Sequence, residues 1–172
     1  MANDPRAKLN PGALKIWDAC GKVFPSNRKD CHKFLMAVAQ ELKVILPIRL
    51  PSDQREPLAD NIVKEIRKQR ATWRSVPSPH EAGNLAQSGK FVVAGLLAEE
   101  LQDPNGHGHV AIVSPFSDEE PKLWCGSLSD SRHPLLRSAG STTYDSIFRK
   151  EIVQAIEKQM FYVYLLPISS AE

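Results

Sequence analysis

Residues 30–42 read DCHKFLMAVAQEL, and residues 108–114 read GHVAIVS. The first stretch predicts a helix, because its apolar residues recur at the spacing of one helix face. These residues are Cys31, Leu35, Val38 and Leu42. We expect Asn27 or Asp30 to cap this helix. The second stretch is an apolar run that predicts a strand over residues 109–113. We therefore expect the start of the helix to pack against this strand.

Elsewhere in the chain, predicted helices come before predicted strands. Helices are expected at residues 11–23, 57–70, 80–88 and 146–158, and further strands at 91–97, 122–125 and 161–166. The first helix carries a loose apolar stripe of Leu14, Trp17 and Val23. Residues 128–143 show no periodicity and are expected to be irregular. Because short loops join consecutive strands, the order predicts an α+β fold with N-terminal helices packed on an antiparallel sheet.

The composition is that of one ordinary globular domain. A chain of 172 residues, 42% hydrophobic and 24% charged, fits a single domain over residues 1–172, with residues 1–10 as a flexible start. Its net charge of +2 is too small to predict nucleic-acid binding, and we expect a monomer. Basic residues gather between Arg49 and Arg74, but acids such as Asp60 interleave them. We therefore expect that run to be a solvated helix face.

The chain shows no segment that predicts a membrane span, a secretion signal or a disulfide framework. No stretch reaches the ~18 apolar residues of a transmembrane helix. Residues 1–11 are polar and contain no apolar core of a signal peptide. The three cysteines are too few for a disulfide scaffold. A bridge between Cys20 and Cys125 is the one pairing that would leave Cys31 reactive.

Cys31 and His109 have the residue types and positions of a nucleophile and its base. A thiol in the first turn of a helix is expected to have a lowered pKa, because free N–H groups and the helix dipole favour the thiolate. A histidine held at the start of a buried strand suits general base catalysis. A buried structural cysteine is the alternative for Cys31, and His107 is the alternative base. Without Cys-x-x-Cys or His-Glu-x-x-His spacing, we expect no metal and no cofactor.

Several short motifs, in this order, resemble the NlpC/P60 branch of the papain-like cysteine peptidases. They are Asp30-Cys31, residues 38–42 (VAQEL), residues 89–96 (GKFVVAGL), residues 108–113 (GHVAIV), residues 124–127 (WCGS) and residues 162–164 (YVY). Within that branch the chain is similar to the amidase effectors of the bacterial type VI secretion system, nearest the first-described family. The resemblance touches residues 27–166. It implies a papain-like fold in which N-terminal helices pack on an antiparallel sheet.

The resemblance also implies a set of site residues. It assigns the nucleophile to Cys31, the base to His109 and a third active-site position to Cys125. From their positions we also expect Asp30 and His32 to border the nucleophile, with Asp30 a cap first and a substrate contact second. Trp124 and Ser127 are expected to line the cleft, with a place in the core as the alternative for Trp124. The chain departs from the family where His32 and Lys33 follow the cysteine, since small residues are usual there. Bulk and positive charge beside the thiol would then alter the rim of the substrate site.

The function implied is a peptidoglycan amidase that hydrolyses the γ-D-glutamyl–meso-diaminopimelate bond of stem peptides. Such a protein is made in the bacterial cytoplasm without a signal peptide, and the type VI secretion apparatus delivers it into the periplasm of a target cell. A cognate immunity protein protects the producer. Two other functions stay open from the residues alone. One is an acyltransferase or a general cysteine peptidase on the same scaffold, and the other is a non-catalytic wall-binding module.

Overall fold

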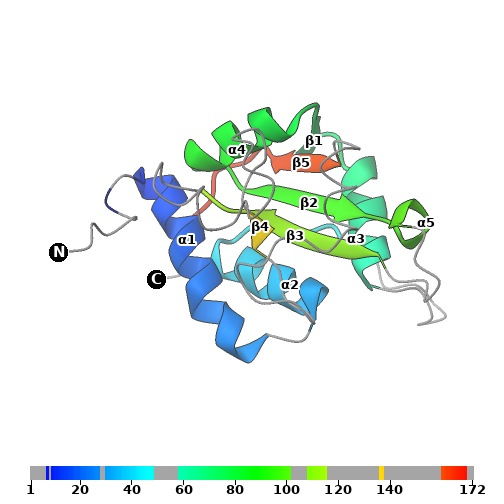
Figure 1. Ribbon diagram of the computed structural model, residues 1–172, viewed down its shortest axis with the longest axis horizontal. Coiled ribbons are helices and arrows are strands. Elements are labelled where there is room, and N and C mark those ends of the chain that lie inside the picture. The colour runs from blue at the N-terminus through cyan, green and yellow to red at the C-terminus, as the bar shows by residue number, and fades with distance from the viewer. Residues whose placement is uncertain are drawn as a thin grey trace, which may run out of the picture.

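The computed structural model describes residues 7, 9–27, 30–48, 58–101, 108–115, 136–137 and 160–169. Its helices are α1 (Pro11–Val23), the 3-10 helix η2 (Phe24–Ser26), α2 (Cys31–Glu41), α3 (Leu58–Lys68), α4 (Pro79–Gln87) and α5 (Ala98–Leu101). Its strands are β1 (Trp73–Val76), β2 (Val92–Leu96), β3 (His109–Val113), β4 (Leu136–Arg137) and β5 (Phe161–Tyr164). Figure 1 shows these elements along the chain.

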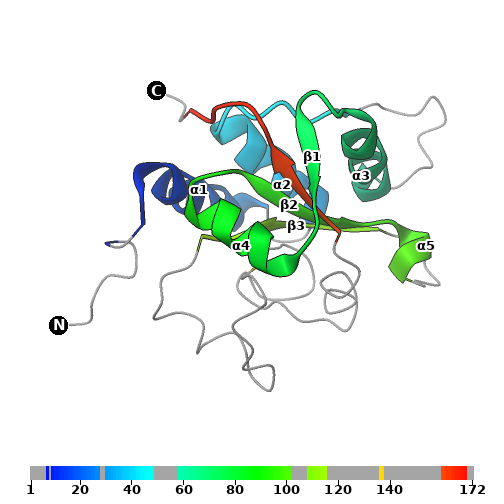
Figure 2. The same cartoon turned by 90° about the horizontal axis from the view of Figure 1, so that it is seen from above.

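The strands form one antiparallel sheet in the order β1-β5-β2-β3-β4. Helices α1, α2 and α3 cover one face, and α4 covers the other (Figure 2). This arrangement confirms the predicted α+β fold with N-terminal helices on an antiparallel sheet. It also places β3 directly against α2, the two elements that the quoted sequence stretches form.

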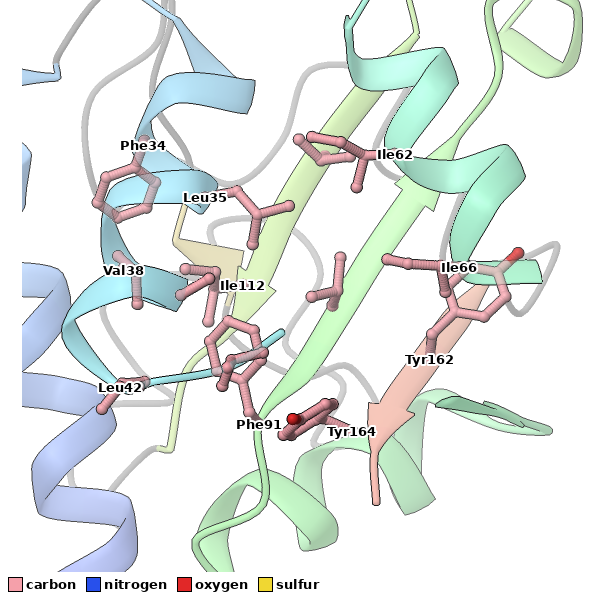
Figure 3. Packing of buried hydrophobic residues seen from close by; sticks show 14 of the residues in the cluster. Phe34, Leu35, Val38, Leu42, Ile62, Ile66, Phe91, Ile112, Tyr162 and Tyr164 are labelled. Carbon is pink, nitrogen blue, oxygen red and sulfur yellow. The ribbon is translucent and has the colours of Figure 1, made fainter. Parts of the chain in front are cut away.

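The main core lies between the sheet and the three N-terminal helices. Figure 3 shows side chains of α2 and α3 meeting side chains of the sheet. The buried members labelled there are Phe34, Leu35, Val38, Leu42, Ile62, Ile66, Phe91, Ile112, Tyr162 and Tyr164. The apolar face predicted for the second helix is therefore the buried face of α2, and Cys31 packs at its margin. A smaller cluster, on the α4 side, contains Ala111 and Val113 of β3.

The first helix buries a different stripe from the one predicted. Its buried residues are Ala13, Ile16, Ala19 and Cys20. Leu14, Trp17 and Val23 are only partly buried, so the expected stripe is wrong. Two small alanines allow α1 to pack closely, and such small side chains do not stand out in the apolar pattern of the sequence. The bounds Pro11–Val23 were nonetheless correct, and Asn10 caps the helix by accepting from the Ala13 N–H at 2.9 Å.

Besides the 3-10 helix η2, three short elements were not predicted. These are β1 (Trp73–Val76), α5 (Ala98–Leu101) and β4 (Leu136–Arg137), the last within a segment expected to be irregular. Each has at most four residues, too few for a period to show in the sequence. The predicted strand at 122–125 and helix at 146–158 lie outside the described residues. Within the described residues, no helix is long and apolar enough to span a membrane.

Candidate active site

Cys31 is the first residue of α2, and its N-terminal neighbour Asp30 occupies the N-cap position. Asp30 has the extended backbone of a cap residue, but among the described residues its side chain makes no capping hydrogen bond. Its carboxylate instead pairs with Lys33 at 3.1 Å. Asn27 is not the cap either, because its side-chain amide donates to the Val23 carbonyl at 2.8 Å. Asp30 is thus the N-cap residue, as predicted, but it caps α2 without a side-chain hydrogen bond to the first N–H groups.

The backbone of β3 opposite α2 is oriented by its pairing with β2. Gly95 of β2 donates its N–H to Met160 on the side away from β3, at 3.1 Å. Gly95 opposes Val110 in the register of β2 and β3. Hydrogen-bonded and non-hydrogen-bonded pairs alternate along an antiparallel ladder, so Gly95–Val110 is a non-hydrogen-bonded pair. The N–H of Val110 therefore points away from β2, toward the edge where the described residues of β4 pair with Ile112 and Val113.

The Cys31 sulfur lies at this edge of β3. The backbone of Val110 forms a hydrogen bond with Cys31 that lowers the pKa of the thiol. Such a bond stabilises the thiolate, so it comes from the N–H of Val110. Val110 directly follows His109, and adjacent Cα atoms are about 3.8 Å apart. The structure thus brings the first residue of α2 to the second residue of β3, which directly follows His109.

His109 is the first residue of β3 and opposes Leu96 of β2. It is partly exposed, whereas the next four residues of the strand are buried. Side chains alternate along a strand, so His109 shares the sheet face of Ala111 and Val113. Cys31 packs against the core cluster on the α2 side of the sheet, whereas this alternation assigns the His109 side chain to the α4 side. A general base at this place is accessible to solvent and held by a strand that is buried beyond it.

The pKa of the Cys31 thiol lies above its ordinary value, contrary to the expected lowering. Burial is the largest cause and raises the pKa. Backbone hydrogen bonds from Val110, from His32 and from Cys31 itself lower it, and the charge of Asp30 raises it. The helix N-terminus therefore does supply groups that favour the thiolate, but burial outweighs them. Removal of the thiol proton consequently needs a base.

His32 adds bulk beside the thiol but no positive charge at neutral pH. Burial lowers its pKa, Asp30 opposes this shift, and Lys33 adds to it. The ring is therefore neutral near pH 7, since even an ordinary histidine has a pKa of about 6.5. Lys33 is exposed and paired with Asp30. The expected change at the substrate rim is thus one of shape, with the charge confined to an exposed ion pair.

Asp60, which the sequence suggested would lie on a solvated helix face, is buried with 6% of its surface exposed. Its two carboxylate oxygens accept from the N–H groups of Ala98 and Gly108, at 2.9 and 2.6 Å. Gly108 immediately precedes His109. The interpretation of residues 49–74 as a solvated face holds for Lys64, which is exposed, and fails for Asp60. An acid in the first turn of a helix is common, so the sequence carried no stronger signal for this site.

The other residues predicted for the site are not among those described. Cys125, Trp124, Ser127 and the competing base His107 all lie outside the described residues, as does one end of the possible Cys20–Cys125 bridge. Cys20 itself is fully buried in the core. Within the part of the chain that the structure describes, no three His, Cys, Asp or Glu side chains could jointly hold a metal ion.

Comparison with known proteins gives one relevant similarity. No protein-family model matches the chain. Over 116 residues the chain is 28% identical to the peptidoglycan amidase Tse1 of Pseudomonas aeruginosa. The chain is similar to Tse1. The matched part is 66% of this chain and 64% of Tse1, so the chain spans a little under two thirds of that protein. This finding confirms the resemblance to the amidase effectors that the sequence motifs indicated.

Proposed function

We propose that this protein is a peptidoglycan amidase with Cys31 as nucleophile and His109 as general base. The observation that carries the proposal is the packing of α2 on β3, where the backbone of Val110, the residue after His109, lowers the pKa of the Cys31 thiol. The similarity to a peptidoglycan amidase supplies the substrate class. Neither observation alone would be sufficient, since a fold or a thiol by itself does not determine a substrate.

The proposed reaction begins with proton transfer from the Cys31 thiol to His109. The thiolate attacks the carbonyl carbon of the amide, and a C–S bond forms while the carbonyl oxygen takes up negative charge. The backbone N–H of Cys31, at the open helix N-terminus, donates to that oxygen, and one such donor is worth about 3 kcal/mol of barrier. His109 then protonates the leaving amine as the C–N bond breaks. Water, deprotonated by His109, hydrolyses the thioester and restores the thiol.

This scheme fits the electrostatics of the cysteine. Because burial raises the pKa of Cys31, the resting enzyme holds the thiol with its proton on. The N–H groups of Val110 and His32 favour the thiolate only once a base accepts the proton. A nearby imidazole is the side chain best suited to that task near neutral pH.

The finer proposal concerns the bond and the setting. We assign the γ-D-glutamyl–meso-diaminopimelate amide as the bond cleaved, and Asp30, His32, Trp124 and Ser127 as the border of the substrate site. Cys125 is the proposed third member of the catalytic group. In this proposal the type VI secretion apparatus delivers the protein into the periplasm of a competitor, and an immunity protein protects the producer. These assignments come from the motif resemblance, which the similarity to Tse1 supports.

The deciding experiment is digestion of purified peptidoglycan followed by liquid chromatography and mass spectrometry. We expect new fragments that carry a free diaminopimelate amine and have gained one water. The Cys31→Ala variant should produce none of them while keeping the thermal unfolding midpoint of a folded protein. Full cleavage by purified Cys31→Ala would overturn the catalytic assignment. Fragments joined to an added amine would instead indicate acyl transfer, and binding without any product would indicate a wall-binding module.

A further inference from the structure

Residues 97–108 connect β2 to β3 and lead into His109. Asp60 of α3 forms a hydrogen bond near each end of this connection. β2 ends at Leu96 and β3 begins at His109, so residues 97–108 join them, with α5 in the first part. Figure 1 shows α5 at the end of the sheet where β2 ends and β3 begins. Asp60 of α3 bonds to Ala98, the first residue of α5, and to Gly108, the last residue before β3. One buried carboxylate therefore ties together two points ten residues apart in sequence.

We propose that Asp60 is a positioning residue that fixes the backbone approach to His109 and so sets where its imidazole lies. This inference rests on the proposed function in one respect, namely that His109 is the base. Asp60 does not act on the substrate. It acts through the N–H of Gly108, which it holds at 2.6 Å while β2 holds His109 itself through the pair with Leu96. By the alternation along the ladder, Leu96–His109 is a hydrogen-bonded pair.

The contact between Asp60 and Gly108 requires a residue without a side chain at position 108. A Cβ atom at residue 108 would lie 2.5 Å from Oδ2 of Asp60 and 2.6 Å from the Leu96 carbonyl oxygen. Only glycine lets the backbone come this close to a carboxylate and to the neighbouring strand. The missing side chain of Gly108 thus leaves the space that the Asp60 carboxylate occupies. The backbone of the residue before His109 has little freedom to move within it.

Hydrogen bonds of Arg67 also join α3 to α5, which limits movement of α3 and so of Asp60. Nη2 of Arg67 donates to both oxygens of Glu100 at 2.8 and 2.9 Å, and Nε donates to the Tyr162 hydroxyl at 2.6 Å. Glu100 also accepts from the Leu97 N–H at 2.8 Å. Since Glu100 belongs to α5 and Tyr162 to β5, Arg67 links α3 to both. Catalytic geometry needs this kind of rigid support, because a misplacement of about 1 Å can cost roughly a hundredfold in rate.

The test uses Asp60→Asn in the full chain. Asparagine keeps the size and one acceptor oxygen, but its NH₂ group would face one of the two backbone N–H groups. Asn10→Ala is the matched control, since the Asn10 side chain also bonds to two backbone groups, Ala13 N–H and the Gln87 carbonyl, away from His109. We measure kcat and KM on muropeptides, and the pH profile of Cys31 alkylation by iodoacetamide, on the folded fraction of each variant.

We expect Asp60→Asn to lower kcat at least tenfold with KM changed less than twofold, and to move the alkylation profile in the direction of His109→Ala. Asn10→Ala should leave both readouts at the wild-type values even if it lowers the unfolding midpoint equally. If Asp60→Asn is folded and has wild-type kcat and a wild-type alkylation profile, the proposal is overturned and Asp60 is only structural. If His109→Ala itself has the wild-type profile, the base assignment fails, and that result is separate because alkylation needs no substrate.

Discussion

The backbone of Val110 forms a hydrogen bond with the Cys31 thiol that lowers its pKa, and the two residues are 79 positions apart in the sequence. This contact joins the first turn of α2 to the strand that starts with His109. It supplies a fixed donor for a thiolate in a place where burial disfavours the charge. In the proposed mechanism, Cys31 is therefore protonated at rest and becomes charged only during the reaction.

His109→Ala should abolish turnover almost as fully as Cys31→Ala, by at least about a thousandfold in kcat. The reason is that the thiol, with its raised pKa, has no other assigned acceptor for its proton. The double variant Cys31→Ala/His109→Ala should be no less active than either single variant, because residues that act as a unit show non-additive losses. Muropeptide turnover measured for all three proteins checks this. Additive losses would indicate that the two side chains work independently.

The stability contributed by the protonated Cys31 thiol should be lost at alkaline pH. Its pKa is raised in the folded protein, so the folded state holds the thiol proton more tightly than the unfolded state does. The contribution is fully present below the unfolded pKa of about 8.5 and falls as the pH rises through the folded value. We expect the unfolding midpoint of the wild type to fall relative to that of Cys31→Ser between pH 7 and pH 10. A constant difference over that range would contradict the burial of the thiol.

The stability contributed by the neutral His32 ring should be lost at acidic pH, opposite to the dependence expected for Cys31. Its pKa is lowered in the folded protein, so the unfolded state takes up a proton first as the pH falls. The stability difference between the wild type and His32→Gln should therefore be constant above about pH 7 and turn against the wild type as the pH falls through about 6.5. Thermal unfolding of both proteins from pH 8 to pH 5 measures it. Lys33→Gln, which removes the neighbouring positive charge, should weaken the effect.

Gly89→Ala should destabilise the fold without altering catalysis. Gly89 follows α4 and has φ +84°, a left-handed conformation that disfavours a side chain. Its Cβ would also lie 2.9 Å from Oδ1 of Asn10 and 2.9 Å from Cα of Gly12. We expect a loss of about 1–3 kcal/mol in the free energy of unfolding, measured in urea. Gly21→Ala, where a Cβ meets nothing within 4 Å, is the control and should not destabilise.

Many of the helices and strands could be predicted, because the sequence patterns that indicate them are local. Regular spacing of apolar residues predicted α2, the apolar run at 109–113 predicted β3 with its correct bounds, and Gly89 marked the end of α4. Short motifs in a fixed order also indicated the amidase resemblance. These signals depend on residues near one another in sequence, so they can be recognised from the sequence alone. The same kind of pattern predicted the wrong buried face for α1, because the buried face of a helix depends on the elements that pack on it.

The sequence by itself determined the elements that carry Cys31 and His109, and the chemistry those two side chains are able to perform. Only the tertiary structure decided the environment of each. Burial raised the pKa of Cys31 where a helix N-terminus alone would have lowered it. Packing of α3 on the sheet turned Asp60 from an expected surface acid into a buried contact of Gly108. The physical reason is that desolvation and long-range hydrogen bonds depend on which segments meet in space, and no local pattern records that.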